Sequence, residues 1–184
     1  LWLTNTNVNP KHSGQQGGVI SNDRNVHIVA MTKASTLHIM DGITIRNTYS
    51  GSDCKSIINV NGSVYMHGGV IDASNITVAG NGGAVNVPAG STFNMSGGTI
   101  NGGTVTGDGT GQGGAIWTAG TLTVTGGTIN GGKAALGGAS FINVANVTID
   151  GGTVTGGSAN DGGTVYNNAG TLDIKSGSVG GGTA

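Results

Sequence analysis

Three charged side chains are the strongest candidates for acid–base chemistry in this sequence. Asp150 and Lys175 occupy the same outward position in two consecutive copies of a short repeated pattern, and Asp173 occupies the other outward position of the second copy. Neighbouring carboxylates beside a cation can act as general acid and general base, for example on a polysaccharide. The alternative is a solvated ion pair between Asp150 and Lys175. Since the chain has only eight acidic residues, we expect the ion pair and no enzymatic activity.

Three aromatic residues recur at one position of a second repeated pattern, in a chain with only two Trp, three Tyr and two Phe. These are Trp117, Phe141 and Tyr166, each the fourth residue after the start of a Gly-Gly sequence. If the preceding residues point inward, the rings form an outward strip that binds sugar rings or another protein. If the alternation is reversed, the rings lie in the core. Ser140, a poor core residue beside Phe141, leaves both interpretations open.

Threonines offer a further class of function, because regular arrays of Thr are typical of ice-binding β-solenoids. The candidate positions are Thr99, Thr121, Thr123, Thr125, Thr128, Thr148 and Thr153. Other residues interrupt the longest columns, among them His67, Asn94, Asp173 and Lys175. The ordinary preference of Thr for strands explains most of the pattern.

Neither metal binding nor covalent catalysis is favoured by the remaining reactive residues. Cys54 is the only cysteine, so the chain has no disulfide and no thiolate zinc site. The histidines, at positions 12, 27, 38 and 67, do not pair at ligand spacing, and we expect them on the surface or in loops. We therefore predict no metal and no cofactor.

The elements that position these residues follow from an internal repeat. The pattern Leu122-Thr-Val-Thr-Gly-Gly-Thr-Ile129 recurs with first residues at 37, 64, 93, 147 and 172, giving successive spacings of 27, 29, 29, 25 and 25. A second marker, Gly-Gly-Ala or Gly-Gly-Thr, begins at Gly82, Gly113, Gly137 and Gly162, and Gly17-Gly-Val-Ile20 resembles it. Two markers in one register indicate an ordered array, although 39 of the 184 residues are Gly.

Each repeat is predicted to contain short strands separated by glycine corners. Apolar residues alternate with polar ones in Leu122-Thr-Val-Thr, which is the period of a strand with one buried face. We predict an all-β, single-stranded right-handed parallel β-helix of 6–7 coils, each of 25–31 residues. It forms a single domain over residues 1–184, with irregular first coils at 1–36, regular repeats at 37–184 and loops at 46–55 and 104–112.

The repeated Gly-Gly-Ala-Ile116 and Gly-Gly-Thr-Ile129 sequences resemble the right-handed parallel β-helices of bacterial surface proteins and autotransporter passengers. A similar Gly-Gly-Ala-Ile motif occurs in polymorphic outer-membrane proteins. The resemblance covers about residues 17–184 and implies an extracellular or cell-surface location and a structural or adhesive role.

Composition limits the possible partners. Seven dispersed cations and a net charge of −1 do not make a nucleic-acid-binding surface. No apolar run reaches the roughly 20 residues of a membrane-spanning helix. The expected partner is another copy of the chain, with surface glycans as a further possibility.

The ends of the array are the predicted assembly surfaces. Neither end shows an amphipathic capping helix, so we expect either a longer chain or coils that continue into another molecule. Head-to-tail contacts of this kind produce a filament. The apolar residues expected at the junction are Leu1, Trp2, Leu3, Leu172, Ile174 and Val179. The alternatives are a carbohydrate-binding or polysaccharide-degrading β-helix and an ice-binding solenoid.

Overall fold

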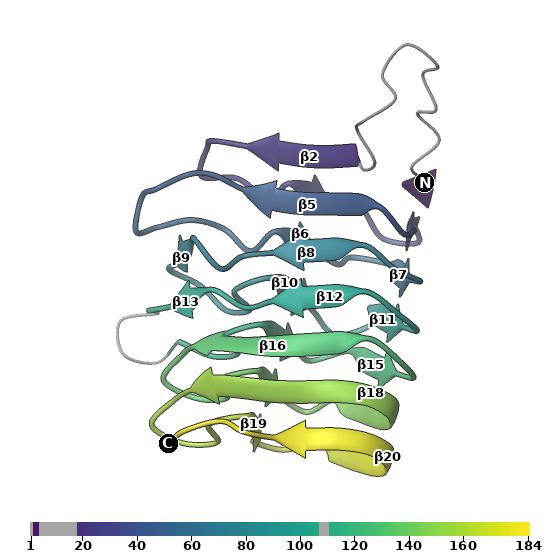
Figure 1. Cartoon of the computed structure of the whole chain (residues 1–184), viewed down its shortest axis with the longest axis vertical. Coiled ribbons are helices and arrows are strands. Elements are labelled where there is room, and N and C mark those ends of the chain that lie inside the picture. Colours follow the sequence, from purple (N-terminus) through teal and green to yellow (C-terminus); the bar gives the residue numbers. More distant parts are fainter. Residues whose placement is uncertain (1, 4–17, 107–110) are drawn as a thin grey trace.

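The chain folds as an all-β parallel solenoid of about 6 turns, as the repeat predicted (Figure 1). The computed structural model describes residues 2–3, 18–106 and 111–184. All strand pairs among these residues are parallel, and each joins consecutive turns. Within this part of the chain there is no helix, and so none that could cross a membrane.

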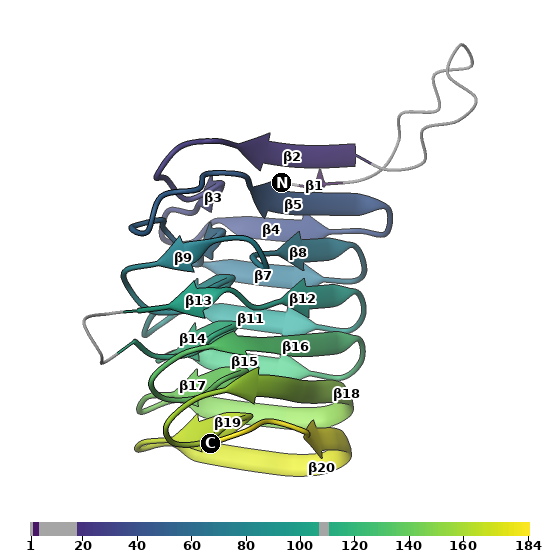
Figure 2. The ribbon, with the colours of Figure 1, turned by 60° about the vertical axis from the view of Figure 1, so that its left-hand side comes forward.

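Three strand ladders run along the solenoid and form its faces (Figure 2). The first face carries the alternating Leu-x-Ile pattern and its equivalents. Its strands are β1 (Trp2–Leu3), β4 (Thr36–Ile39), β7 (Ser63–Met66), β11 (Thr92–Met95), β15 (Thr121–Val124) and the first halves of β18 (Asn146–Ser158) and β20 (Thr171–Gly180). Their inward residues are buried in the inner coils, whereas the outward residues are polar or aromatic.

The second face follows directly after the glycine corner. It comprises β2 (Gly18–Asn22), β5 (Ile43–Asn47), β8 (Val70–Asp72), β12 (Thr99–Asn101), β16 (Thr128–Lys133) and the second halves of β18 and β20. Two short strands, β9 (Thr77–Val78) and β13 (Thr104–Val105), extend it. Because β18 continues through the corner, the first and second faces belong to one 14-stranded sheet.

The third face is a separate 6-stranded sheet built on the second sequence marker. Its strands are β3 (Val29–Ala30), β6 (Ile58–Asn59), β10 (Val85–Val87), β14 (Ile116–Thr118), β17 (Ser140–Ile142) and β19 (Val165–Asn167).

The core consists of columns of side chains contributed by successive coils. The predicted column Phe93, Leu122, Val147, Leu172 is confirmed by direct strand register, and Leu37 and Val64 extend it. The column from Ile71 to Val179 is confirmed in the same way. Burying each large apolar side chain contributes roughly 1.5–3 kcal/mol, so these columns supply the core that the composition obscured.

Two details of the sequence interpretation were wrong. The segment beginning at Gly18 does not join the third face, since β2 pairs with β5 and Ile20 lies beside Ile45. Its true counterpart is the identical sequence Gly68-Gly-Val-Ile71 on the second face. The predicted loop at 104–112 begins as a strand, because Thr104 and Val105 pair with Thr77 and Val78. Residues 107–110 of that loop lie outside the described residues.

The corner between the first two faces requires glycine. Gly98 and Gly127 have φ values of 86° and 84°, which are left-handed conformations that side chains disfavour. A Cβ at Gly127 would lie 2.6 Å from the carbonyl oxygen of Gly98 in the preceding coil. The corners therefore stack backbone against backbone, and this close stacking fixes the register of the coils.

Candidate functional site

The predicted aromatic ladder forms on the third face. Trp117, Phe141 and Tyr166 are direct neighbours in the strand register, and the rings of Phe141 and Tyr166 stack with centroids 5.4 Å apart and planes 8° from parallel. Ser140 and Ile142 line the interior together with Val165. Since residues alternate along a strand, the ring of Phe141 faces outward.

The ladder offers less free surface than its outward direction suggested. Phe141 is only 1% exposed, although it faces away from the core columns. Trp117 is half-buried, and its Nε1 donates a hydrogen bond of 2.9 Å to Oε1 of Gln112. The rings therefore help hold successive coils together, and a ligand would reach mainly the edges of Trp117 and Tyr166. A binding role for Trp117, Phe141 and Tyr166 remains a prediction.

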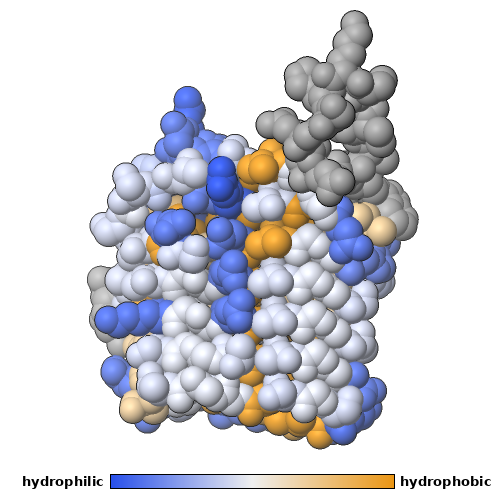
Figure 3. All heavy atoms as spheres, in the orientation of Figure 1, coloured by the Kyte–Doolittle hydropathy of each residue, from blue (hydrophilic) through white to orange (hydrophobic). Residues whose placement is uncertain are grey.

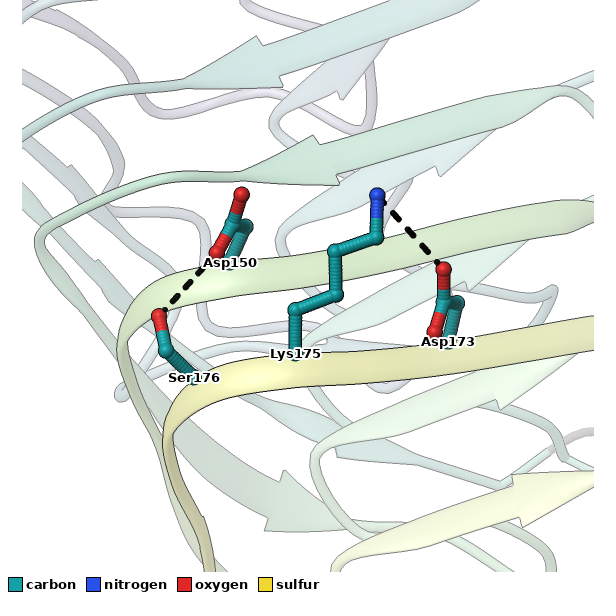
Figure 4. Close-up of polar contacts among 4 residues, drawn as sticks. All are labelled: Asp150, Asp173, Lys175 and Ser176. Carbon is teal, nitrogen blue, oxygen red and sulfur yellow. Dashed lines mark hydrogen bonds and ion pairs between the residues drawn. The ribbon is translucent and has the colours of Figure 1, made fainter.

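The acidic cluster does not have the predicted pairing (Figure 4). Asp150 pairs in register with Ser176, because the ladder shifts by one residue after Ile149 and Ile174. Lys175 instead lies 3.6 Å from Asp173 on its own strand, and Ser176 Oγ donates to Asp150 Oδ1 at 3.1 Å. Lys175 and Asp173 are 55% and 52% exposed, so solvent screens their attraction.

The two predicted assembly ends differ in what the structure describes. Leu1 lies outside the described residues, while Trp2 and Leu3 form β1 and pair with His38 and Ile39. At the other end Ile174 is 50% exposed, whereas Ile149, its neighbour in the same column, is 2% exposed. Leu172 and Val179 are half-buried against the core. Hydrophobic surface is visible along the lower edge of the molecule, where β20 lies (Figure 3).

The sequence analysis missed a cluster of three rings on the first face. His38, Tyr65 and His67 are mutually stacked, with interplanar angles of 6–14°. Nδ1 of His38 lies 3.2 Å from Nε2 of His67. Partial burial, reinforced by the nearby charge of His67, lowers the pKa of His38. The prediction that the histidines do not pair was wrong. The 27-residue spacing placed His38 beside Tyr65, and His67 lies only two residues further along the strand.

A shallow groove continues from this ring cluster along the first face. Its outward-facing lining is Tyr65, His67, Asn94, Ser96, Thr123 and Thr125. Ser96 Oγ lies 3.4 Å from Nδ1 of His67 and donates to the backbone carbonyl of Met66. The groove therefore joins an imidazole pair to a row of hydroxyl and amide groups.

Other candidate residues have structural partners. His27 Nδ1 lies 2.8 Å from the carbonyl oxygen of Ser56, and the free Cys54 is buried and accepts a hydrogen bond from Asn47. Burial raises the pKa of the Cys54 thiol. Thr99, Thr128 and Thr153 form an in-register column, with Val70 before it and Ser178 after it. No group of three or more His, Cys, Asp or Glu suited to a metal gathers within the described ranges.

Comparisons with known proteins do not assign a family. No family model matches the chain, and searches among curated proteins and solved structures find no match. The chain is a parallel β-solenoid of about 6 turns.

Proposed function

We propose that this chain is a non-enzymatic structural module of an extracellular surface protein that joins end to end with other copies into a filament. The observation that carries the proposal is the apolar column that is exposed along β20. Ile174 is 50% exposed there, whereas Ile149 directly beside it is 2% exposed. A further coil placed against β20 would bury Ile174 as β20 buries Ile149.

The opposite end of the solenoid has strand edges that could pair in parallel with β20 of another copy. Among the described residues, β1, β2 and β3 each pair on one side only, with β4, β5 and β6. Such edges accept a parallel strand from another chain. Because the two ends of a solenoid are different surfaces, their contact is heterologous and repeats without closing. The expected assembly is therefore a filament along the solenoid axis.

Polar side chains on the second face bond to one another along the solenoid. On the second face the Nδ2 of Asn130 donates to Asn101 Oδ1 at 2.8 Å, and Asn101 in turn donates to Asp72 at 3.4 Å. These ladders direct side-chain hydrogen bonds along the rod, from coil to coil. The first and last of the described coils, in contrast, carry strand edges that pair with no other described residue. This difference supports assembly through the ends rather than through the sides.

The proposal is tested with purified protein over a range of concentrations. Electron microscopy and sedimentation velocity should show filaments that lengthen with concentration. Ile174→Asp should abolish them, because a carboxylate would be buried in the junction without a partner. Val144→Asp is the matched control, since Val144 is 72% exposed in the turn before β18 and lies away from the junction column.

Two results would contradict the proposal. The first is a protein that remains monomeric at high concentration. The second is a filament that Ile174→Asp and Val144→Asp weaken equally, because the contact would then not involve the end of the solenoid.

A further inference from the structure

The pair of imidazoles on the first face has the geometry of two ligands to one metal ion. The facing nitrogens of His38 and His67 are 3.2 Å apart. In a tetrahedral zinc site with Zn–N bonds of about 2.0–2.1 Å, two ligand nitrogens are about 3.3 Å apart. The backbone thus brings the two nitrogens to the separation that a tetrahedral cation requires.

We propose that Nδ1 of His38 and Nε2 of His67 bind a divalent cation of the zinc type, with water at the remaining coordination positions. Imidazole nitrogen is a preferred ligand for zinc, copper and nickel ions. The site extends beyond the proposed structural role and does not depend on end-to-end assembly, because it lies within two adjacent coils of one chain.

Ser96 selects the form of His67 that the ion needs. When Nδ1 of His67 carries its proton and donates to Ser96 Oγ, Nε2 is left with a free lone pair toward His38. Ser96 can accept that proton because its own hydroxyl donates to the carbonyl of Met66. Metal-binding histidines are commonly oriented by such a second hydrogen bond. Ser96 is therefore a positioning residue for this site.

Binding of the ion requires the proton of His38 to change ring nitrogens, and both histidines stay neutral. Without metal, the proton between the two rings belongs to Nδ1 of His38 when Nδ1 of His67 carries the other proton. On binding, neutral His38 carries its proton on Nε2 and directs the Nδ1 lone pair to the ion, while small rotations of both rings aim the lone pairs at a common point. Tyr65 stacks on His38 with ring centroids 5.1 Å apart. This contact already restricts the imidazole, so less rotational freedom is lost when the ion binds.

One carboxylate lies near the pair of histidines. The Asp41 carboxylate lies against Gly68, the residue after His67, and adds a negative charge nearby.

The test is titration of the untagged full chain with zinc chloride, followed by calorimetry and by the melting temperature. We expect one equivalent of zinc to bind and to raise the melting temperature. His38→Gln and His67→Gln should each weaken binding at least tenfold, and the double variant should lose at least as much affinity as either single variant. His27→Gln is the control, since that ring is held by Ser56.

A second measurement separates binding from folding. Ser96→Ala should lower the zinc affinity about tenfold while leaving the circular dichroism spectrum unchanged. X-ray absorption of the zinc-loaded protein should show two imidazole nitrogens in the wild type and fewer in either histidine variant. Zinc binding that is absent, or that is unaffected by His38→Gln and His67→Gln, would overturn the proposal.

Discussion

The N-terminal coils, residues 18–80, and the C-terminal coils, residues 82–184, build the same solenoid with different corners. In the N-terminal part, side chains hold the turn after β5: the Asp53 carboxylate accepts hydrogen bonds from Asn25 at 2.7 Å and from Tyr49 at 3.2 Å. In the C-terminal part, glycines stack on one another. Gly113, Gly137 and Gly162 repeat one left-handed conformation, with φ of 71°, 67° and 63°.

The two parts also carry different functional groups. A glycine corner brings the backbones of adjacent coils so close that no side chain fits between them. The turn after β5 in the N-terminal part instead holds the side chains of Asn25, Tyr49 and Asp53. The stacked histidines and the buried cysteine all lie in this part. The C-terminal coils carry the aromatic ladder and the Asp173–Lys175 ion pair instead.

The largest effect is expected from a methyl group in a glycine corner. Gly127→Ala should destabilise the fold by about 3–5 kcal/mol, because it adds left-handed strain and a collision with the Gly98 carbonyl oxygen at 2.6 Å. Gly90→Ala has the same strain, at φ 79°, but its Cβ meets nothing within 4 Å, so about 1–2 kcal/mol is expected. Urea unfolding measures both. Equal losses would show that backbone stacking does not set the corner.

A smaller effect distinguishes an inner coil from the end coil. Ile149→Ala should cost about 2–4 kcal/mol, because it leaves a cavity in a buried column. Ile174→Ala, in the same column but 50% exposed, should cost less than about 1 kcal/mol in dilute protein. The comparison is made by urea unfolding below the concentration at which filaments form. Similar costs would mean that the end coil is already covered in solution.

The turn after β5, which contains Cys54, should lose stability at alkaline pH. Burial raises the pKa of Cys54 above its ordinary value of 9.0, so the folded state holds a proton that the unfolded chain releases. The stabilisation is complete below that ordinary value and is lost as pH rises through the folded pKa. The melting temperature should therefore fall more between pH 8 and pH 10 in the wild type than in Cys54→Ala. A parallel decline in both proteins would remove Cys54 as the cause.

The smallest effect is expected at the exposed ion pair of the last coil. Lys175→Ala should change stability by no more than about 0.5 kcal/mol, because both partners are more than half exposed. Unfolding in low and high salt checks this result. A larger loss of stability that depends on salt would contradict this prediction and show that the Asp173–Lys175 pair stabilises the fold.

The register of the fold was predictable because apolar side chains recur wherever the coils stack. The spacing from Leu122 to Val147 was sufficient to align β15 with β18. The spacing from Val147 to Leu172 could not reveal the local shift at Asp150, because the β18–β20 ladder slips after Ile149 and regains its register by Thr153. The total length is unchanged, so the repeat contains no sign of the slip.

The candidate sites were harder to predict because side chains reach beyond their own column. His38 and His67 occupy different columns, and only the length of their rings joins them diagonally. Phe141 was placed in the correct ladder, but its burial depends on the neighbouring rings and chain. Alternation predicts the direction of a side chain, whereas exposure is decided by everything packed around it.

The in-register stacking of equal coils has a consequence for how such a chain can grow. Each coil contacts only the coil before it and the coil after it, so stability accumulates along the rod as a sum of similar steps. Tandem duplication of one 25-residue unit, such as 122–146, would insert one more rung without creating a new kind of contact. Each added unit would lengthen the rod by about 4.8 Å. Its reach is thus a dimension that gene duplication can change in equal increments.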